Sequence, residues 1–226
     1  METAVVTGSS SGIGEAIARF LLSRGFRVIG ISRSAGLIED ENFSHLRCDL
    51  SNPSELRGLK KQLPRDVKIL INSAGFGRFA PHEELDIDTI LSMSMLNLTA
   101  PIALANMMLR ELKQSGGIII NITSIEATRY SRHSGLYSAT KAGLRSFGLS
   151  LFEEVRNAGV RVVTINPDMT DTSFFDNLRF GVGSSDDTKL FCDDLVRAIE
   201  YILDSRDGVC VSEMTIRPQK FGITKK

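Results

Sequence analysis

The chain has 226 residues, of which 42% are hydrophobic and 24% are charged, and its formal net charge at pH 7 is zero. This balance gives no reason to expect nucleic acid or an anionic membrane as a partner. Cys48, Cys192 and Cys210 are scattered without ligand-like spacing, so we expect no disulfide framework and no metal site. No signal peptide is visible, and no apolar stretch approaches the roughly 20 residues that span a bilayer, so we expect a cytoplasmic protein.

Strand-like and helix-like segments alternate along the whole chain. In chain order the pattern predicts a strand at residues 3–7, a helix at 13–23, strands at 27–31 and 46–48, a helix at 53–63, a strand at 67–71, a long helix at 88–113, a strand at 117–122, a helix at 136–157, a strand at 160–165, a helix at 193–203 and a strand at 209–216.

Such alternation implies parallel strands joined by helical crossovers. We therefore expect one α/β domain over residues 1–226, a Rossmann-type doubly wound parallel sheet of about seven strands with helices on both faces. Residues 168–189 are the least regular part of the chain, and they could form a mobile lid or a long loop.

A glycine-rich turn, Thr7-Gly-Ser-Ser-Ser-Gly-Ile-Gly14, follows the first strand and opens the first helix. This is the context in which a turn can bind phosphate, because the helix N-terminus offers unpaired N–H groups. Gly8 would permit the tight turn, Gly12 would let the backbone approach a pyrophosphate, and Gly14 would allow close packing of helix and strand. An ordinary tight turn remains the alternative.

The end of the second strand indicates which dinucleotide would bind. An acidic residue there would favour NAD, because it accepts hydrogen bonds from the ribose 2′-hydroxyl. The chain instead has Ser32 and Arg33, and Arg33 could pair with a 2′-phosphate while Ser32 adds a hydrogen bond. This favours NADPH, although a solvated loop arginine is the alternative.

Tyr137 and Lys141 are four residues apart in a predicted helix, so they share one face of it. A lysine ammonium beside a phenol would stabilise the phenolate and lower the pKa of the tyrosine. Tyr137 is thus a candidate proton donor and acceptor near neutral pH. Ser124 precedes it by thirteen residues.

Taken together, these motifs resemble the short-chain dehydrogenase/reductase family over nearly the whole chain. The Asn72-Ser-Ala-Gly75 segment is similar to the family's Asn-Asn-Ala-Gly motif, and Asp168 replaces a usual glycine after Asn166-Pro167. The resemblance implies a catalytic set of Asn97, Ser124, Tyr137 and Lys141. It also implies cofactor contacts from Gly8, Ser10, Ser11, Gly12, Ile13, Gly14, Ser32, Arg33, Asp49, Leu50, Asn72, Ala74, Gly75, Tyr137, Lys141, Pro167 and Thr172.

The implied function is hydride transfer between NADP(H) and a carbonyl or secondary alcohol. Tyr137 would supply the proton, Ser124 would position the carbonyl, and Asn97 would hold a water beside Lys141. The expected substrate pocket is built from residues 76–79, 126–130 and 169–180. A non-catalytic NADP-binding sensor on the same fold and another nucleotide-dependent α/β enzyme such as a methyltransferase are the rival functions.

The resemblance further implies a homodimer or homotetramer. The family commonly packs its fourth and fifth helices into a four-helix bundle between subunits. The residues offered for this contact are Leu91, Met95, Leu98, Leu104 and Met108 on one helix, and Ala139, Ala142, Gly143, Ser146, Leu149 and Phe152 on the other.

Overall fold

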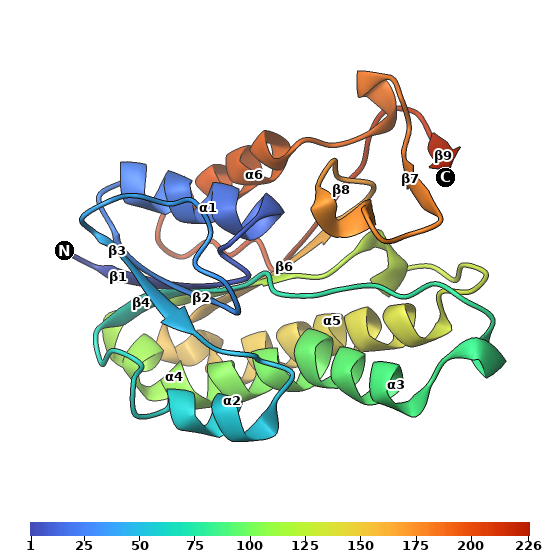
Figure 1. Ribbon diagram of the computed structural model, residues 1–226. Coiled ribbons are helices and arrows are strands. Elements are labelled where there is room, and N and C mark those ends of the chain that lie inside the picture. The colour runs from blue at the N-terminus through green and yellow to red at the C-terminus, as the bar shows by residue number, and fades with distance from the viewer.

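The structure, a computed structural model, describes residues 1–226 and is built on a seven-stranded sheet (Figure 1). The strands lie in the order β3-β2-β1-β4-β5-β6-β8, and every neighbouring pair is parallel. They are β1 (Thr3–Thr7), β2 (Arg27–Ser32), β3 (Phe43–Arg47), β4 (Val67–Asn72), β5 (Ile118–Ile122), β6 (Arg161–Pro167) and β8 (Glu213–Ile216). The predicted doubly wound α/β fold is confirmed.

Helices cover both faces of the sheet, as Figure 1 shows. On one face lie α1 (Gly12–Ser23) and α6 (Cys192–Asp204); on the other lie α2 (Pro53–Leu59), α3 (Ile87–Ser94), α4 (Ala100–Ser115) and α5 (Gly135–Val155). Ile17, Leu21 and Ile199 belong to the core beneath the first pair. Because the central strands β1, β4 and β5 are covered on both sides, they read as continuous apolar runs rather than as alternating ones.

The long helix predicted at residues 88–113 runs from Ile87 to Ser115, but a π-helical segment, Met95–Thr99, interrupts it. Pro101 lies two residues after this segment, and its missing N–H deprives the Asn97 carbonyl of its usual helical partner. Such interruptions often mark functional sites. The irregularity places Asn97 on the inner side of the helix, where its side chain is fully buried.

This helix also corrects the expectation about membrane-spanning stretches. Ile87–Ser115 is 29 residues long, and its most apolar window has a mean hydropathy of 1.4, so length and composition alone would let it cross a bilayer. In the fold, Leu104, Met108 and Leu112 of this helix are buried in the core beside the sheet.

Several predicted element boundaries are wrong. The third strand covers Phe43–Arg47 rather than 46–48, and the second helix ends at Leu59 rather than 63. The last strand of the sheet begins at Glu213 rather than 209, where its pairing with Thr164 of β6 starts. Residues 209–212 pack as partly buried chain outside the strand.

The irregular stretch 168–189 is largely ordered by local structure and by the C-terminus. It contains β7 (Phe180–Val182), which pairs antiparallel with β9 (Ile223–Lys225) in a separate two-stranded sheet. Two short 3-10 turns, Ser173–Phe175 and Asp186–Thr188, flank β7. Neither the short strand nor its partner was predicted, and whether this segment moves as a lid stays a prediction.

Candidate active site

A cavity of about 600 Å³ lies beyond the carboxyl ends of β1, β4, β5 and β6. The chain turns to opposite sides of the sheet at the neighbouring strands β1 and β4, and doubly wound sheets bind ligands outside such a switch point. The lining includes Ile13, Gly75, Ser124, Tyr137, Lys141, Pro167 and Thr172 from the predicted site residues. The structure therefore brings the predicted catalytic residues and the nicotinamide end of the predicted cofactor set together, with Asn97 directly behind them.

The glycine turn is as tight as its sequence suggests. Gly8 has a φ of +69°, and a Cβ built on it would lie 2.9 Å from the Cα of Ala74. A Cβ on Gly14 would lie 2.3 Å from the Gly8 carbonyl oxygen. The Thr7 hydroxyl accepts hydrogen bonds from the backbone N–H groups of Ser73 and Ala74, at 3.0 Å each. The turn is thus fixed directly against the end of β4.

The turn also offers hydrogen-bond donors to an anion at the start of α1. Ser11 is the N-cap residue of α1, yet its side chain makes no hydrogen bond to the first turn of the helix. The first N–H groups of a helix have no partner within the helix, so these donors are available to a ligand phosphate. Gly12 has a φ of +57°, and its Cβ position lies 3.4 Å from the Thr172 side chain. The residues present fit a dinucleotide.

At the end of β2, Arg33 is exposed and forms no ion pair within 4.0 Å. Ser32 is more constrained, because its hydroxyl donates a 2.7 Å hydrogen bond to the Ser34 carbonyl. The Asp49 carboxylate accepts hydrogen bonds from the N–H and hydroxyl of Ser51, and these, with help from Arg33, hold its pKa below the usual value. Leu50 points into the core, so only its backbone can face a cofactor.

Ser124, Tyr137 and Lys141 come together because two elements meet at the cavity. Ser124 follows β5 and caps a short turn, accepting a 3.2 Å hydrogen bond from the Glu126 N–H. Tyr137 and Lys141 both point inward from the first turns of α5, with 6% and 5% of their surfaces exposed. The Lys141 ammonium donates a 2.9 Å hydrogen bond to the carbonyl of Ile122, the last residue of β5.

Burial reverses the pKa shift expected for Tyr137. Its burial raises the pKa to about 12, although the Ser124 hydroxyl opposes this rise. Burial also lowers the pKa of Lys141 to about 8. The expectation that Lys141 lowers the pKa of Tyr137 is therefore wrong for this structure, since desolvation disfavours the charged form of both groups.

Asn97 uses its side chain to hold two other segments. Its amide nitrogen donates hydrogen bonds to the Phe76 carbonyl, at 2.9 Å, and to the Thr140 hydroxyl, at 3.2 Å. Its amide oxygen accepts a 3.1 Å hydrogen bond from the Phe76 N–H. The same oxygen lies 3.1 Å from the Cβ position of Gly75, and Lys141 Nζ lies 3.3 Å from that position. Both N–H donors of the amide are therefore used, and a water held by Asn97 would have to meet one of its two oxygens, in the side chain or the backbone.

Two predicted cofactor residues, Asn72 and Ser10, contact other parts of the protein rather than the cavity. Asn72 is buried, and its amide nitrogen donates a 2.8 Å hydrogen bond to the side-chain oxygen of Asn121 on the neighbouring strand. Ser10 lies at the outer side of the glycine turn, where the Cβ position of Gly36 approaches its Cα to 2.8 Å. Neither side chain lines the cavity.

Aromatic side chains form the apolar wall of the cavity. The Phe79 and Phe174 rings lie 5.1 Å and 5.9 Å from the Tyr137 ring, measured between centroids. Phe180 lies 5.1 Å from Phe79 and 5.9 Å from Phe175, so the four phenylalanines form one aromatic cluster that meets the tyrosine through Phe79 and Phe174. The predicted pocket segments around Phe79 and residues 169–180 do line the cavity.

Asp168, which replaces the usual glycine, is engaged by two arginines. Its carboxylate accepts a 3.0 Å hydrogen bond from Arg217 Nε, and Arg129 lies 3.9 Å from its other oxygen. Arg129 also donates a 2.8 Å hydrogen bond to Glu126, whose burial disfavours ionisation. Hydrogen bonds from Arg129 and Ser131 outweigh that burial and hold the pKa of Glu126 below its usual value.

Four residues line the cavity although the sequence did not predict them there: Arg132, His133, Ile223 and Lys225. Tyr130, which was expected in the pocket, instead points fully into solvent. The contribution of the C-terminal residues depends on the pairing of β9 with β7, and a three-residue exposed strand leaves no pattern in the sequence. A positive φ of 64° at His133, unusual for a residue with a side chain, had no sequence signal either.

Comparison with known proteins agrees with this geometry. Residues 2–181 match the family model of the short chain dehydrogenases. An uncharacterized oxidoreductase of Staphylococcus aureus is 34% identical over 230 residues, covering 95% of this chain and 96% of that protein. An alcohol dehydrogenase from the archaeon Thermococcus sibiricus, complexed with 5-hydroxy-NADP, superposes with a TM-score of 0.86 at 28% identity, covering 97% and 98% of the two chains. A 4-hydroxyisoleucine dehydrogenase complexed with NADH has a TM-score of 0.85 at 25% identity, covering 96% and 98%.

Proposed function

The chain belongs to the short-chain dehydrogenase family of oxidoreductases, and on that premise we propose that it transfers hydride between NADP(H) and a carbonyl or secondary alcohol. The observation that carries this proposal is the convergence of Ser124, Tyr137 and Lys141 on one cavity next to the glycine turn. A binding protein without catalysis would have no need of a buried phenol and a buried ammonium facing the same cavity.

The side chains have complementary roles in this proposal. A bound NADPH would supply the hydride. The negative charge that develops on the carbonyl oxygen then requires a proton donor and a hydrogen-bond donor. Tyr137, whose phenol is protonated at neutral pH, donates the proton to that oxygen. The Ser124 hydroxyl donates a second hydrogen bond and fixes the carbonyl in place. Lys141 holds the nicotinamide ribose, and Asn97 keeps the residue 75–76 segment in position behind it.

The preference for NADP over NAD rests on residues of this chain, since solved relatives carry cofactors of both kinds. Arg33 is exposed at the end of β2 and pairs with no carboxylate, so it is free to meet a 2′-phosphate. Hydrogen bonds from Ser51 lower the pKa of Asp49. This acid follows β3, however, and not β2, where the ribose 2′-hydroxyl would be bound. No acid stands at the end of β2 to accept from a ribose 2′-hydroxyl.

The test is a screen of aldehydes, ketones and secondary alcohols with NADPH and NADP, following the absorbance of the reduced cofactor. The proposal predicts turnover of at least one carbonyl compound, lost when Tyr137 is replaced by Phe. Cofactor binding without turnover of any compound would contradict it.

A further inference from the structure

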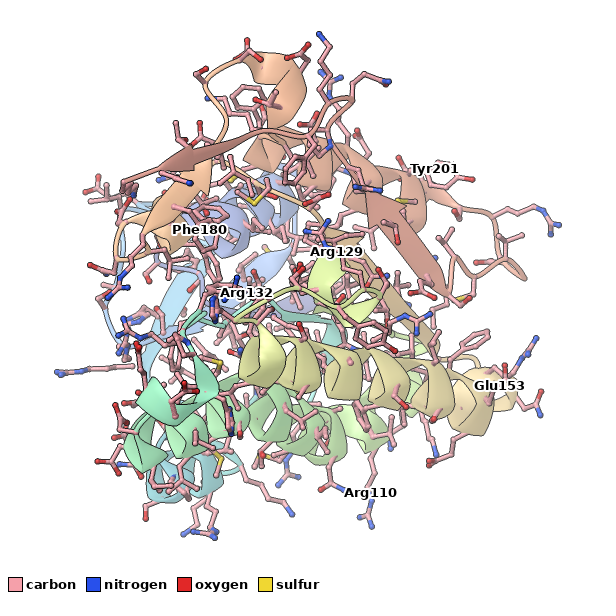
Figure 2. All side chains as sticks on the ribbon, turned by 90° about the vertical axis from the view of Figure 1, so that its right-hand side faces the viewer. Arg110, Arg129, Arg132, Glu153, Phe180 and Tyr201 are labelled. Atoms are coloured by element: carbon pink, nitrogen blue, oxygen red, sulfur yellow. The ribbon has the colours of Figure 1, made fainter.

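The mouth of the cavity carries three cations that have no acidic partner. Arg132, Arg179 and Lys225 all line the cavity, come from three separate segments, and take part in no ion pair or side-chain hydrogen bond. In Figure 2, Arg132 lies just below Phe180 at the opening between the helical layer and the β7–β9 segment. All three side chains are exposed at this opening, so a ligand can reach them.

The acids nearby do not neutralise these cations. Glu126 and Asp168 also line the cavity, but each is already paired with an arginine, Arg129 or Arg217. Glu84 is the one lining acid without an ion pair. The opening therefore has an excess of positive charge, and such a charged cleft attracts anions.

The residue that follows Arg132 has an unfavourable backbone conformation. His133, its neighbour, has a φ of 64°, the one positive φ in the chain outside glycine. The His133 carbonyl accepts a 3.2 Å hydrogen bond from the Ala80 N–H, which fastens this turn to the opposite wall. Unfavourable backbone conformations of this kind persist where surrounding structure enforces them, and they cluster at ligand sites.

Deeper in the cavity the character changes from charged to apolar. Phe180 follows Arg179 in the chain and pairs with Lys225 between β7 and β9, so it lies beside two of the three cations. Its ring lies 5.1 Å from that of Phe79, which lies 5.1 Å from the Tyr137 ring, and Phe174 lies 5.9 Å from Tyr137. A ligand that reaches Tyr137 from the mouth must therefore lay an apolar body along these rings. Its anionic group would remain outside, among the three cations.

We propose that the substrate is a carbonyl or alcohol compound with an apolar body that ends in a carboxylate, which Arg132, Arg179 and Lys225 bind. The proposal rests on the proposed oxidoreductase function. In the reducing direction the carbonyl carbon gains the hydride, its oxygen gains the Tyr137 proton as the C=O double bond becomes single, and NADPH is oxidised to NADP. The carboxylate is unchanged, and bulk water returns the proton to Tyr137.

The test compares 4-formylbenzoate with its methyl ester, two aldehydes that differ by one charge at the far end of the same ring. Their binding is measured by calorimetry on protein loaded with NADP, which has no hydride to give. We expect the acid to bind roughly 10-fold more tightly than the ester, the scale of a charge-assisted contact. High salt should reduce this preference, because exposed cations are screened.

The decisive variant is the double replacement Arg132→Ala with Arg179→Ala. It should bring the two affinities to within about 2-fold of each other by weakening only the acid. Arg110→Ala is the matched control, because Arg110 is exposed on α4 at the far side of the helical layer, as Figure 2 shows, and it should keep the preference. Equal affinities in the wild type, or a preference that survives the double replacement, would overturn the proposed carboxylate site.

Turnover with NADPH distinguishes a failure of the proposed carboxylate site from a failure of the proposed oxidoreductase function. If the ester is reduced as efficiently as the acid, the oxidoreductase proposal stands and the carboxylate site is wrong. If the acid binds with the predicted preference and neither aldehyde nor any other carbonyl is reduced, the site stands as an anion site and the oxidoreductase proposal is wrong.

Discussion

The Nζ atom of Lys141 lies 5.9 Å from the centre of the Tyr137 ring and donates its hydrogen bond to the carbonyl of Ile122 instead. The two side chains therefore share a face of α5, as their spacing requires, while the ammonium is satisfied by the end of β5. This arrangement links the helix that carries Tyr137 to the strand that precedes Ser124.

The buried ammonium should make stability depend on pH. Burial lowers the pKa of Lys141 from 10.5 to about 8, so between these values the unfolded chain binds more protons than the folded one. Stability should therefore rise with pH across this window. Urea unfolding at pH 7.5 and 9.5 measures the free energy of unfolding at each pH. Its increase between the two should be roughly 1–2 kcal/mol larger in the wild type than in Lys141→Met. Identical pH dependence in the two proteins would mean that Lys141 titrates normally in the folded state.

The raised pKa of Tyr137 should change stability in the opposite direction, and at higher pH. Its pKa of about 12 exceeds the ordinary value of 10, so the folded protein keeps a proton that the unfolded chain loses. Between these values stability should fall as pH rises. Tyr137→Phe should remove that fall, as measured by unfolding at pH 9.5 and 11, and a variant that loses stability as steeply as the wild type would exclude this assignment.

Cofactor choice depends on Arg33. NADPH should bind at least about 10-fold more tightly than NADH, equivalent to about 1.4 kcal/mol. Arg33→Ala should weaken NADPH and leave NADH nearly unchanged, since NADH has no phosphate to pair with. Titration of the reduced cofactor by its fluorescence measures both constants. A loss of equal size for both cofactors would make Arg33 an ordinary loop residue.

Gly14 should tolerate no side chain. A Cβ there would lie 2.3 Å from the Gly8 carbonyl oxygen, so the backbone of the turn would have to move. We expect Gly14→Ala to destabilise the protein by about 1–3 kcal/mol and to weaken cofactor binding. Gly58→Ala in α2 is the control, because its Cβ would meet nothing within 4 Å and alanine favours a helix by about 0.5–1 kcal/mol. Equal stability of the two variants would argue against the close packing at Gly14.

The expected subunit contact needs correction. Leu104 and Met108, which were predicted to face a second subunit, are buried in the core, and Gly143 faces Leu98 of the same chain. The faces left exposed are those of Leu91 on α3 and of Ala139, Ala142 and Ser146 on α5.

We still expect a homodimer or homotetramer through these helices. Light scattering should give a multiple of the chain mass, and Ala142→Arg should reduce it because a charge would enter the apolar contact. Ala158→Arg, on an exposed turn after α5, should have no effect. A single-chain mass for the wild type at micromolar concentration would contradict the expectation.

The parts of the molecule that follow from local pattern could be predicted, and the parts that depend on distant contacts could not. The apolar run before Gly8 identifies β1, and the four-residue spacing of Tyr137 and Lys141 puts them on one helix face. The pKa shifts of these two residues depend on burial, which their spacing does not reveal. Likewise, Lys225 reaches the cavity only because β9 pairs with β7 across more than forty residues, as the register of Phe180 with Lys225 shows.

The central claim is that Tyr137 donates the proton during hydride transfer, and one replacement tests it most directly. Tyr137→Phe keeps the ring that packs against Phe79 and Phe174 and removes only the hydroxyl. With a substrate identified by the NADPH screen, turnover should fall by roughly 100-fold or more, the scale of a lost general acid, while the affinity for NADPH stays unchanged. Turnover of Tyr137→Phe within a few-fold of the wild type, at the same cofactor affinity, would contradict the claim.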